Sequence, residues 1–226
     1  MTTFIPKIIQ IDGADSTLPV LVVTTSFSER SSRATTQVVI DNYISIPYLN
    51  QKYKMIIIIE CYPTSFKDRA AAAYNAAQLS QSEDPHPEDI NYQILALEVI
   101  DWLFTLNLDR IHLLGKCAGA SLAQFIVQES KDLNSNKVFI HCQGKTISIG
   151  KLILTVPASR TPELLLDYHI PLICAWQMND PQVFTWGPIS EDLERYAKIF
   201  KNKTNVTLVT FPGDQHEIPV EVFLLL

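Results

Sequence analysis

Residues 110–130 read RIHLLGKCAGASLAQFIVQES, and this stretch decides the fold. An apolar run at 110–114 leads into Gly-Lys-Cys-Ala-Gly at 115–119, and apolar residues at helical spacing follow. This order predicts a strand, a sharp turn and a helix. The two glycines would let the strand and the helix approach closely around a strained central residue. The pattern therefore predicts that Cys117 projects from the turn, over the positive end of the helix.

The same alternation of apolar runs and helical patterns extends in both directions. Further strands are expected at residues 18–25, 54–61, 151–156, 170–176 and 205–211, with an edge strand at 4–11. Helical patterns cover residues 90–106, 118–130 and 190–200, and less regularly 34–49. Continuous Val, Ile and Leu runs are typical of strands covered on both faces. We therefore expect one α/β domain over 1–226, with a doubly wound, mainly parallel sheet of about six to seven strands.

Composition and charge narrow the classes of function. The chain has 226 residues, a net charge of −6 and scattered basic residues, which argues against nucleic acid as a partner. The longest apolar run, at 55–59, is too short to span a bilayer. The N-terminus does not resemble a signal peptide, so we expect a cytoplasmic protein. Neither glycine-rich nucleotide-binding motif occurs, which counts against a nucleotide-binding protein.

The four cysteines differ in their surroundings. Cys61 and Cys174 lie in apolar runs and are expected in the core, whereas the role of Cys142 stays open. Their spacing, together with that of Cys117, matches neither a zinc site nor a dense disulfide framework. We therefore expect no metal and no cofactor. Only Cys117 has a motif around it.

The Gly-x-Cys-x-Gly turn resembles the nucleophile elbow of the α/β-hydrolase superfamily, with cysteine where serine is usual. Within the superfamily, the cysteine form looks most like the dienelactone hydrolase family. The resemblance implies a nucleophile, an acid and a histidine in that order along the chain. The loop FPGDQH after the last strand then offers His216 as the base, and the turn NDPQV offers Asp180 as the acid. Asp214 is a competitor for the acid.

The resemblance also implies the groups that would surround a substrate. The backbone N–H of Ala118, with a second one from Ser26 or Phe27, would hold the oxyanion. Phe184 and Trp186 are apolar residues in an expected surface turn. They would form a wall for the substrate, contact a partner, or cap the core beneath the turn.

Two functions from different classes remain open. The first is an enzyme that cleaves a small-molecule carboxylic ester, lactone or thioester through an acyl-cysteine. The second is a non-catalytic binding or structural protein on the same fold, because fold alone does not fix function. Residues 159–169 are too few for the lid that many relatives carry there, and residues 133–150 predict a small inserted hairpin. The apolar tail at 220–226 would pack onto the core or onto a protein partner.

Overall fold

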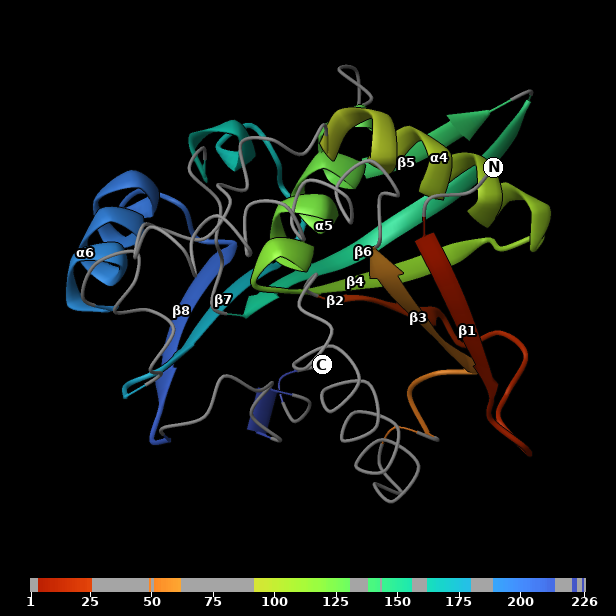
Figure 1. Cartoon of the computed structure of the whole chain (residues 1–226), viewed down its shortest axis with the longest axis horizontal. Helices are drawn as coiled ribbons and strands as arrows, with labels where there is room; N and C mark the ends of the chain where they lie inside the picture. Colours follow the sequence, from red (N-terminus) through yellow and green to blue (C-terminus); the bar gives the residue numbers. More distant parts are fainter. Residues whose placement is uncertain are drawn as a thin grey trace, which may run out of the picture.

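The described part of the chain forms an eight-stranded, mostly parallel sheet with helices against it (Figure 1). The computed structural model describes residues 4–25, 49, 51–61, 92–130, 138–142, 144–155, 162–179, 189–213, 221–222 and 225. The strands are β1 (Phe4–Gln10), β2 (Val20–Thr25), β3 (Met55–Cys61), β4 (Arg110–Lys116), β5 (Val138–Cys142), β6 (Lys145–Thr155), β7 (Leu172–Gln177) and β8 (Val206–Phe211). The helices are α4 (Tyr92–Thr105), α5 (Ala118–Glu129) and α6 (Ile189–Phe200), with a 3-10 turn, η2 (Pro162–Leu165).

The sheet follows the order β1-β3-β2-β4-β6-β7-β8, and β5 pairs with the first half of β6. The six strands from β3 to β8 along this path run parallel to one another, whereas β1 and β5 are antiparallel to their partners β3 and β6. Every strand expected from an apolar run is present, so the prediction of a mainly parallel α/β sheet is confirmed. The expected six to seven strands are too few, because β5 adds an eighth.

The segment expected as a separate hairpin insert is part of the main sheet. β5 and the start of β6 do form an antiparallel hairpin, but β6, eleven residues long in all, continues past it to Thr155. Ile147 and Ile149 are buried, while the residues between and before them are at least partly exposed. This period-two alternation is typical of a strand with one buried face. In the sequence, the polar residues around the two isoleucines obscure it.

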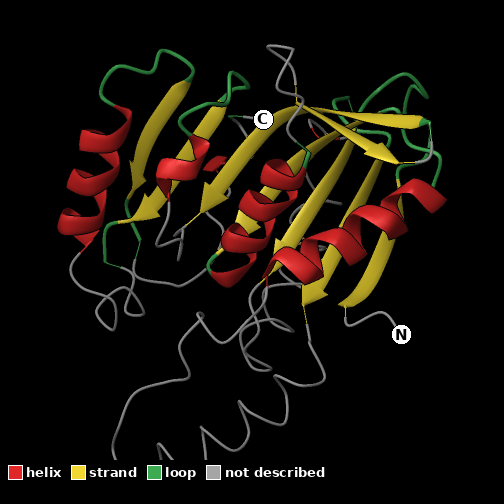
Figure 2. Cartoon of the chain, turned by 90° about the horizontal axis from the view of Figure 1, so that it is seen from above, coloured by secondary structure: helices red, strands yellow, loops and turns green. Residues whose placement is uncertain are grey.

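Two apolar clusters lie on opposite faces of the sheet. One face packs against α4, α5 and α6 through fully buried residues such as Val99, Ile126 and Tyr196. Figure 2 shows these three helices along the sheet. The other face packs against Leu49, Tyr53 and Val222. The helix expected at 34–49 lies outside the described residues apart from Leu49.

Part of the C-terminal tail packs onto the chain's own core. Val222 is fully buried in the second cluster, and Leu225 packs against it. Lys151 also donates a hydrogen bond from Nζ to the Leu225 carbonyl oxygen at 2.9 Å. The sequence left two alternatives for the tail, packing onto the core or onto a protein partner. For Val222 and Leu225, the structure shows packing onto the core. Among the described residues, no helix is both long and apolar enough to span a membrane.

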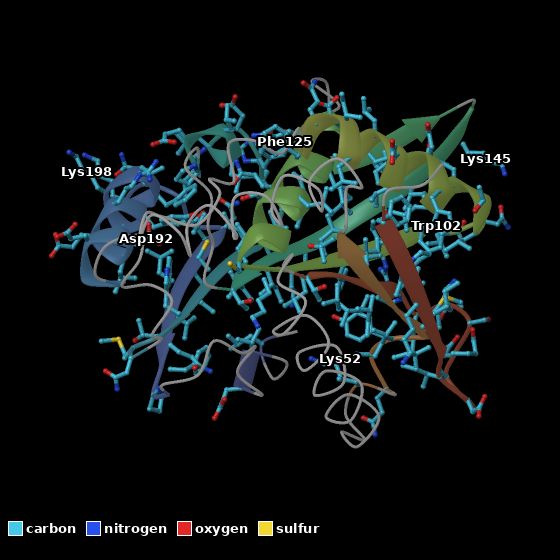
Figure 3. All side chains as sticks on the ribbon, in the orientation of Figure 1. Lys52, Trp102, Phe125, Lys145, Asp192 and Lys198 are labelled. Carbon is cyan, nitrogen blue, oxygen red and sulfur yellow. The ribbon has the colours of Figure 1, made fainter. Side chains whose placement is uncertain are left out.

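A partly buried polar contact joins α6 to β7. The Trp176 indole donates to Asp192 Oδ2 at 3.1 Å, and the Trp176 ring meets Tyr196 edge-on at 5.2 Å between centroids. Figure 3 labels Asp192 on α6. Burial raises the pKa of Asp192, which the indole hydrogen bond and the Arg195 cation partly oppose. The contact fixes the start of α6 beside the carboxyl end of β7.

Candidate active site

Cys117 occupies the tight turn between β4 and α5, as the sequence predicts. Its backbone has φ 52° and ψ −121°, and α5 begins at the next residue. In the described part of the chain, Asn107 is the only other non-glycine residue with a positive φ. Such a conformation costs of order 1–3 kcal/mol and persists only when the surroundings impose it. Such strained residues cluster at active sites, so the backbone marks Cys117 as a candidate functional residue.

The two flanking glycines are required by close contacts. A Cβ on Gly115 would lie 2.5 Å from the Ala120 Cα, and one on Gly119 would lie 2.2 Å from the Thr24 carbonyl oxygen. Both obstacles are backbone atoms that cannot rotate away. The glycines thus let α5 approach β4 and β2 closely on either side of Cys117.

Hydrogen bonds from the neighbouring strands hold the turn. The Cys117 N–H donates to the Thr155 carbonyl at the end of β6 (3.0 Å), and the Thr155 hydroxyl donates to the Gly115 carbonyl (3.2 Å). On the other side, the Thr24 hydroxyl donates to the Gly119 carbonyl at 2.6 Å. Hydrogen bonds to the ends of β2 and β6 therefore hold the turn on both sides.

A layer of buried polar side chains underlies the same edge of the sheet. Thr25, Lys116, Thr155 and Gln177 end four neighbouring strands and are all buried, Lys116 completely. Because side chains alternate along a strand, these four share the face of the second apolar cluster. Strand registers place Lys116 beside Thr155 and Thr155 beside Ala175. Lysine is seldom fully buried, and no pattern around Lys116 predicts its burial.

The predicted acid and base, Asp180 and His216, lie outside the described residues, but the structure describes the segment that precedes each of them. Asp180 directly follows Asn179, whose N–H donates to the Gly213 carbonyl at 3.0 Å. Gly213 precedes His216 by three residues, and a Cβ on it would lie 3.0 Å from the Gln177 amide. The segments that lead into the two predicted residues are therefore side by side, while their contacts with Cys117 remain a prediction.

The other predicted site residues divide in the same way. Ala118 is the first residue of α5, so its N–H lies at the helix N-terminus beside Cys117. Ser26 and Phe27 directly follow the end of β2, and they lie outside the described residues, as do Phe184 and Trp186. One apolar residue was not predicted: Met178, just after β7, is 51% exposed at this edge.

The two cysteines whose side chains the structure describes contrast with each other. Cys117 is partly buried, whereas Cys174 is fully buried and unpaired within the core. Burial and the Asp192 carboxylate raise the pKa of the Cys174 thiol. Within the described ranges, no three His, Cys, Asp or Glu side chains gather as a metal site would require.

His112 has a structural environment of its own on β4. Its Nδ1 is 3.1 Å from the Tyr53 hydroxyl, and a Cβ on Gly150 would lie 2.8 Å from its Nε2. Burial, followed by the nearby cations of Lys151, Arg110 and Lys52, lowers its pKa to about 4. Five residues of strand place it about 16 Å from Cys117, which fits the prediction that it is not the base.

Similarity to known proteins appears only at the level of structure. No family model matches the sequence, and no curated protein is significantly similar to it. Est1E from Butyrivibrio proteoclasticus superimposes with a TM-score of 0.61 at 14% identity, over 97% of this chain and 89% of that one. A putative hydrolase from Agrobacterium vitis S4 gives 0.58 at 13% identity, over 98% and 89%.

A third structure bears on the lid. XC6422 from Xanthomonas campestris, described as a member of the α/β serine hydrolases without a lid, matches with a TM-score of 0.50 at 13% identity, over 94% of this chain and 80% of that one. In the present chain, the described residues between β6 and β7 form only the turn η2. The elbow, the strand order and these superpositions agree that the chain has the α/β-hydrolase fold.

Proposed function

We propose that this protein hydrolyses a small carboxylic ester, lactone or thioester through an acyl-cysteine on Cys117. The observation that carries the proposal is the backbone of Cys117, held at φ 52° between two glycines that cannot bear a side chain. A structural cysteine needs neither the strain nor the contacts. A nucleophile needs both, because they present its side chain at the helix N-terminus, where negative charge is stabilised.

In the proposed reaction, the Cys117 sulfur attacks the substrate carbonyl carbon while His216 accepts the thiol proton. The tetrahedral oxyanion is held by the N–H of Ala118 and by one from Ser26 or Phe27. Collapse expels the alcohol or thiol, which takes the proton back from His216. Water, activated by His216, then attacks the acyl-cysteine, and Asp180 orients the imidazole throughout. Phe184, Trp186 and Met178 would border the acyl group.

The neighbours support this class of chemistry without fixing it. One neighbouring structure is titled as ferulic acid bound to Est1E from Butyrivibrio proteoclasticus, and another is titled as the esterase PE8. These titles describe those proteins, and at 13% identity they set the fold alone. The ester or thioester substrate of this chain is therefore an inference from the elbow.

Turnover of short activated esters and of short acyl thioesters tests the proposal. We expect Cys117→Ala to lower kcat/KM by at least about a hundredfold, and His216→Asn and Asp180→Asn to lower it too. Cys174→Ala serves as the control, because that thiol is buried and should leave turnover intact. No turnover by folded wild-type protein, or full turnover by Cys117→Ala, would instead favour a non-catalytic binding or structural protein.

A further inference from the structure

The two margins of the sheet are built differently. β1, with the sequence FIPKIIQ, carries Pro6 and the exposed Lys7, both of which discourage another strand from pairing with it. β8, with the sequence VTLVTF, contains no proline and no charge. Within the described part of the chain, β8 pairs only with β7. Figure 2 shows β8 at one margin of the sheet.

Backbone hydrogen bonds show which groups of β8 face outward. The carbonyls of Asn205 and Phe211 accept bonds from residues at the two ends of β7, so the odd-numbered positions point toward β7. Since N–H and C=O groups alternate sides along a strand, those of Val206, Leu208 and Thr210 point to the open edge. Each of these residues presents one donor and one acceptor there.

The side chains of β8 are also less covered than those of the interior strands. All six residues of β2 are buried, as are all six of β7, whereas none of β8 is buried and Thr207 and Thr210 are exposed. Natural sheets seldom leave a flat, uncharged, β-branched edge unprotected, because it invites pairing with another strand. Among the described residues, this edge lacks the proline and the charge that the opposite margin carries.

We propose that β8 pairs antiparallel with β8 of a second copy of this chain, giving a two-fold dimer with one continuous sheet. A two-fold axis perpendicular to the sheet reverses the strand but keeps its faces, so only residues of the same parity can lie opposite each other. One register satisfies all three outward residues. It is centred on Leu208, with Leu208 opposite its own equivalent and Val206 opposite Thr210 of the second copy.

This register suits the residues involved. In the hydrogen-bonded pairs of an antiparallel ladder, the two residues exchange both backbone bonds, so none of the outward groups of Val206, Leu208 and Thr210 stays open. Between them, Thr207 lies opposite Val209, a β-branched pair. The strand has no charge, so self-pairing brings no like charges together. A second copy is favoured over an unrelated strand because the same three residues then provide the backbone donors and acceptors on both sides of the pairing.

The oligomeric state of the wild-type chain is the first test. We expect sedimentation equilibrium at micromolar concentrations to give twice the monomer mass. A monomer at all these concentrations overturns the proposal.

The second test addresses the register. Val206→Glu with Thr210→Glu places carboxylates opposite each other at both ends of the pairing, and it should give a monomer. Val206→Lys with Thr210→Glu places opposite charges there and should restore the dimer, which also shows that these changes permit folding. Leu97→Glu with Thr105→Glu, on exposed positions of α4, makes the same charge change away from the edge and should stay dimeric. A dimer that the double-Glu variant leaves intact, or one that the Lys/Glu variant fails to restore, contradicts pairing through β8 in this register.

Discussion

Gly119→Ala tests whether the close approach of α5 to β2 holds the elbow. The new Cβ would lie 2.2 Å from the Thr24 carbonyl oxygen and 2.8 Å from the Thr25 nitrogen, whereas real Cβ contacts stay above 3.0 Å. The start of α5 and the end of β2 must therefore separate by about 0.8 Å, which also weakens the bond from the Thr24 hydroxyl. Overpacking and the weakened hydrogen bond together should cost about 2–4 kcal/mol of the free energy of unfolding.

The same displacement moves Cys117 relative to everything around it. A shift of nearly 1 Å at a reacting group costs on the order of a hundredfold in rate. We expect this loss in kcat, together with a changed rate of Cys117 alkylation. Urea unfolding followed by circular dichroism measures the stability, and ester turnover measures the rate.

Gly144→Ala is the matched control for this experiment. Gly144 has φ +80° and open space around it, so alanine there should cost about 1 kcal/mol from its left-handed conformation and leave turnover unchanged. If Gly119→Ala unfolds at the wild-type urea concentration and keeps wild-type turnover, close packing does not hold the elbow.

Three further predictions concern other buried groups. His112 has a pKa of about 4 in the folded protein, against about 6.5 in the unfolded chain, so between these values the unfolded chain binds the proton more readily. The free energy of unfolding should therefore fall by up to roughly 3 kcal/mol as pH drops from 6.5 toward 4. Urea unfolding across this range measures the fall, and a fall of the same size in His112→Gln would refute the assignment to His112. Lys116→Ala should cost at least about 2 kcal/mol because the whole side chain is buried, whereas the exposed Lys201→Ala should cost almost nothing, and equal midpoints in urea would speak against the buried layer. Brief iodoacetamide treatment should label Cys117 faster than Cys174 by peptide mass spectrometry; equal labelling of the folded protein would mark Cys117 as structural.

Most of the fold could be predicted because its strands are covered on both faces. Runs such as residues 54–61 are apolar throughout, which only a buried parallel strand or a buried helix explains, and their short length decides for the strand. β6 was harder, since its first half has only one buried face and carries Lys145, Thr146 and Ser148 among its isoleucines. The first half of β6 is a strand because it pairs with β5, and the periodicity of a single segment does not predict such pairing.

The candidate site was predictable only in part. The glycines around Cys117 are a local signal, because the turn itself requires them. The burial of Lys116 and Gln177 is not local: it follows from the neighbouring strand ends that share one face of the sheet, and each residue alone is typical of an exposed position. The contacts of Asp180 and His216 rest on loops that follow β7 and β8, where sequence order carries the prediction.

The location of the acyl group after reaction with an activated ester tests the central claim most directly. Rapidly quenched protein should carry one acyl group on the peptide that contains Cys117, and hydroxylamine should remove it. The group should persist longer in His216→Asn, in which deacylation is slowed, and it should be absent from Cys117→Ala. An acyl group on any other residue, or steady turnover with Cys117 unmodified and replaceable by alanine, would contradict the proposal that Cys117 is the nucleophile.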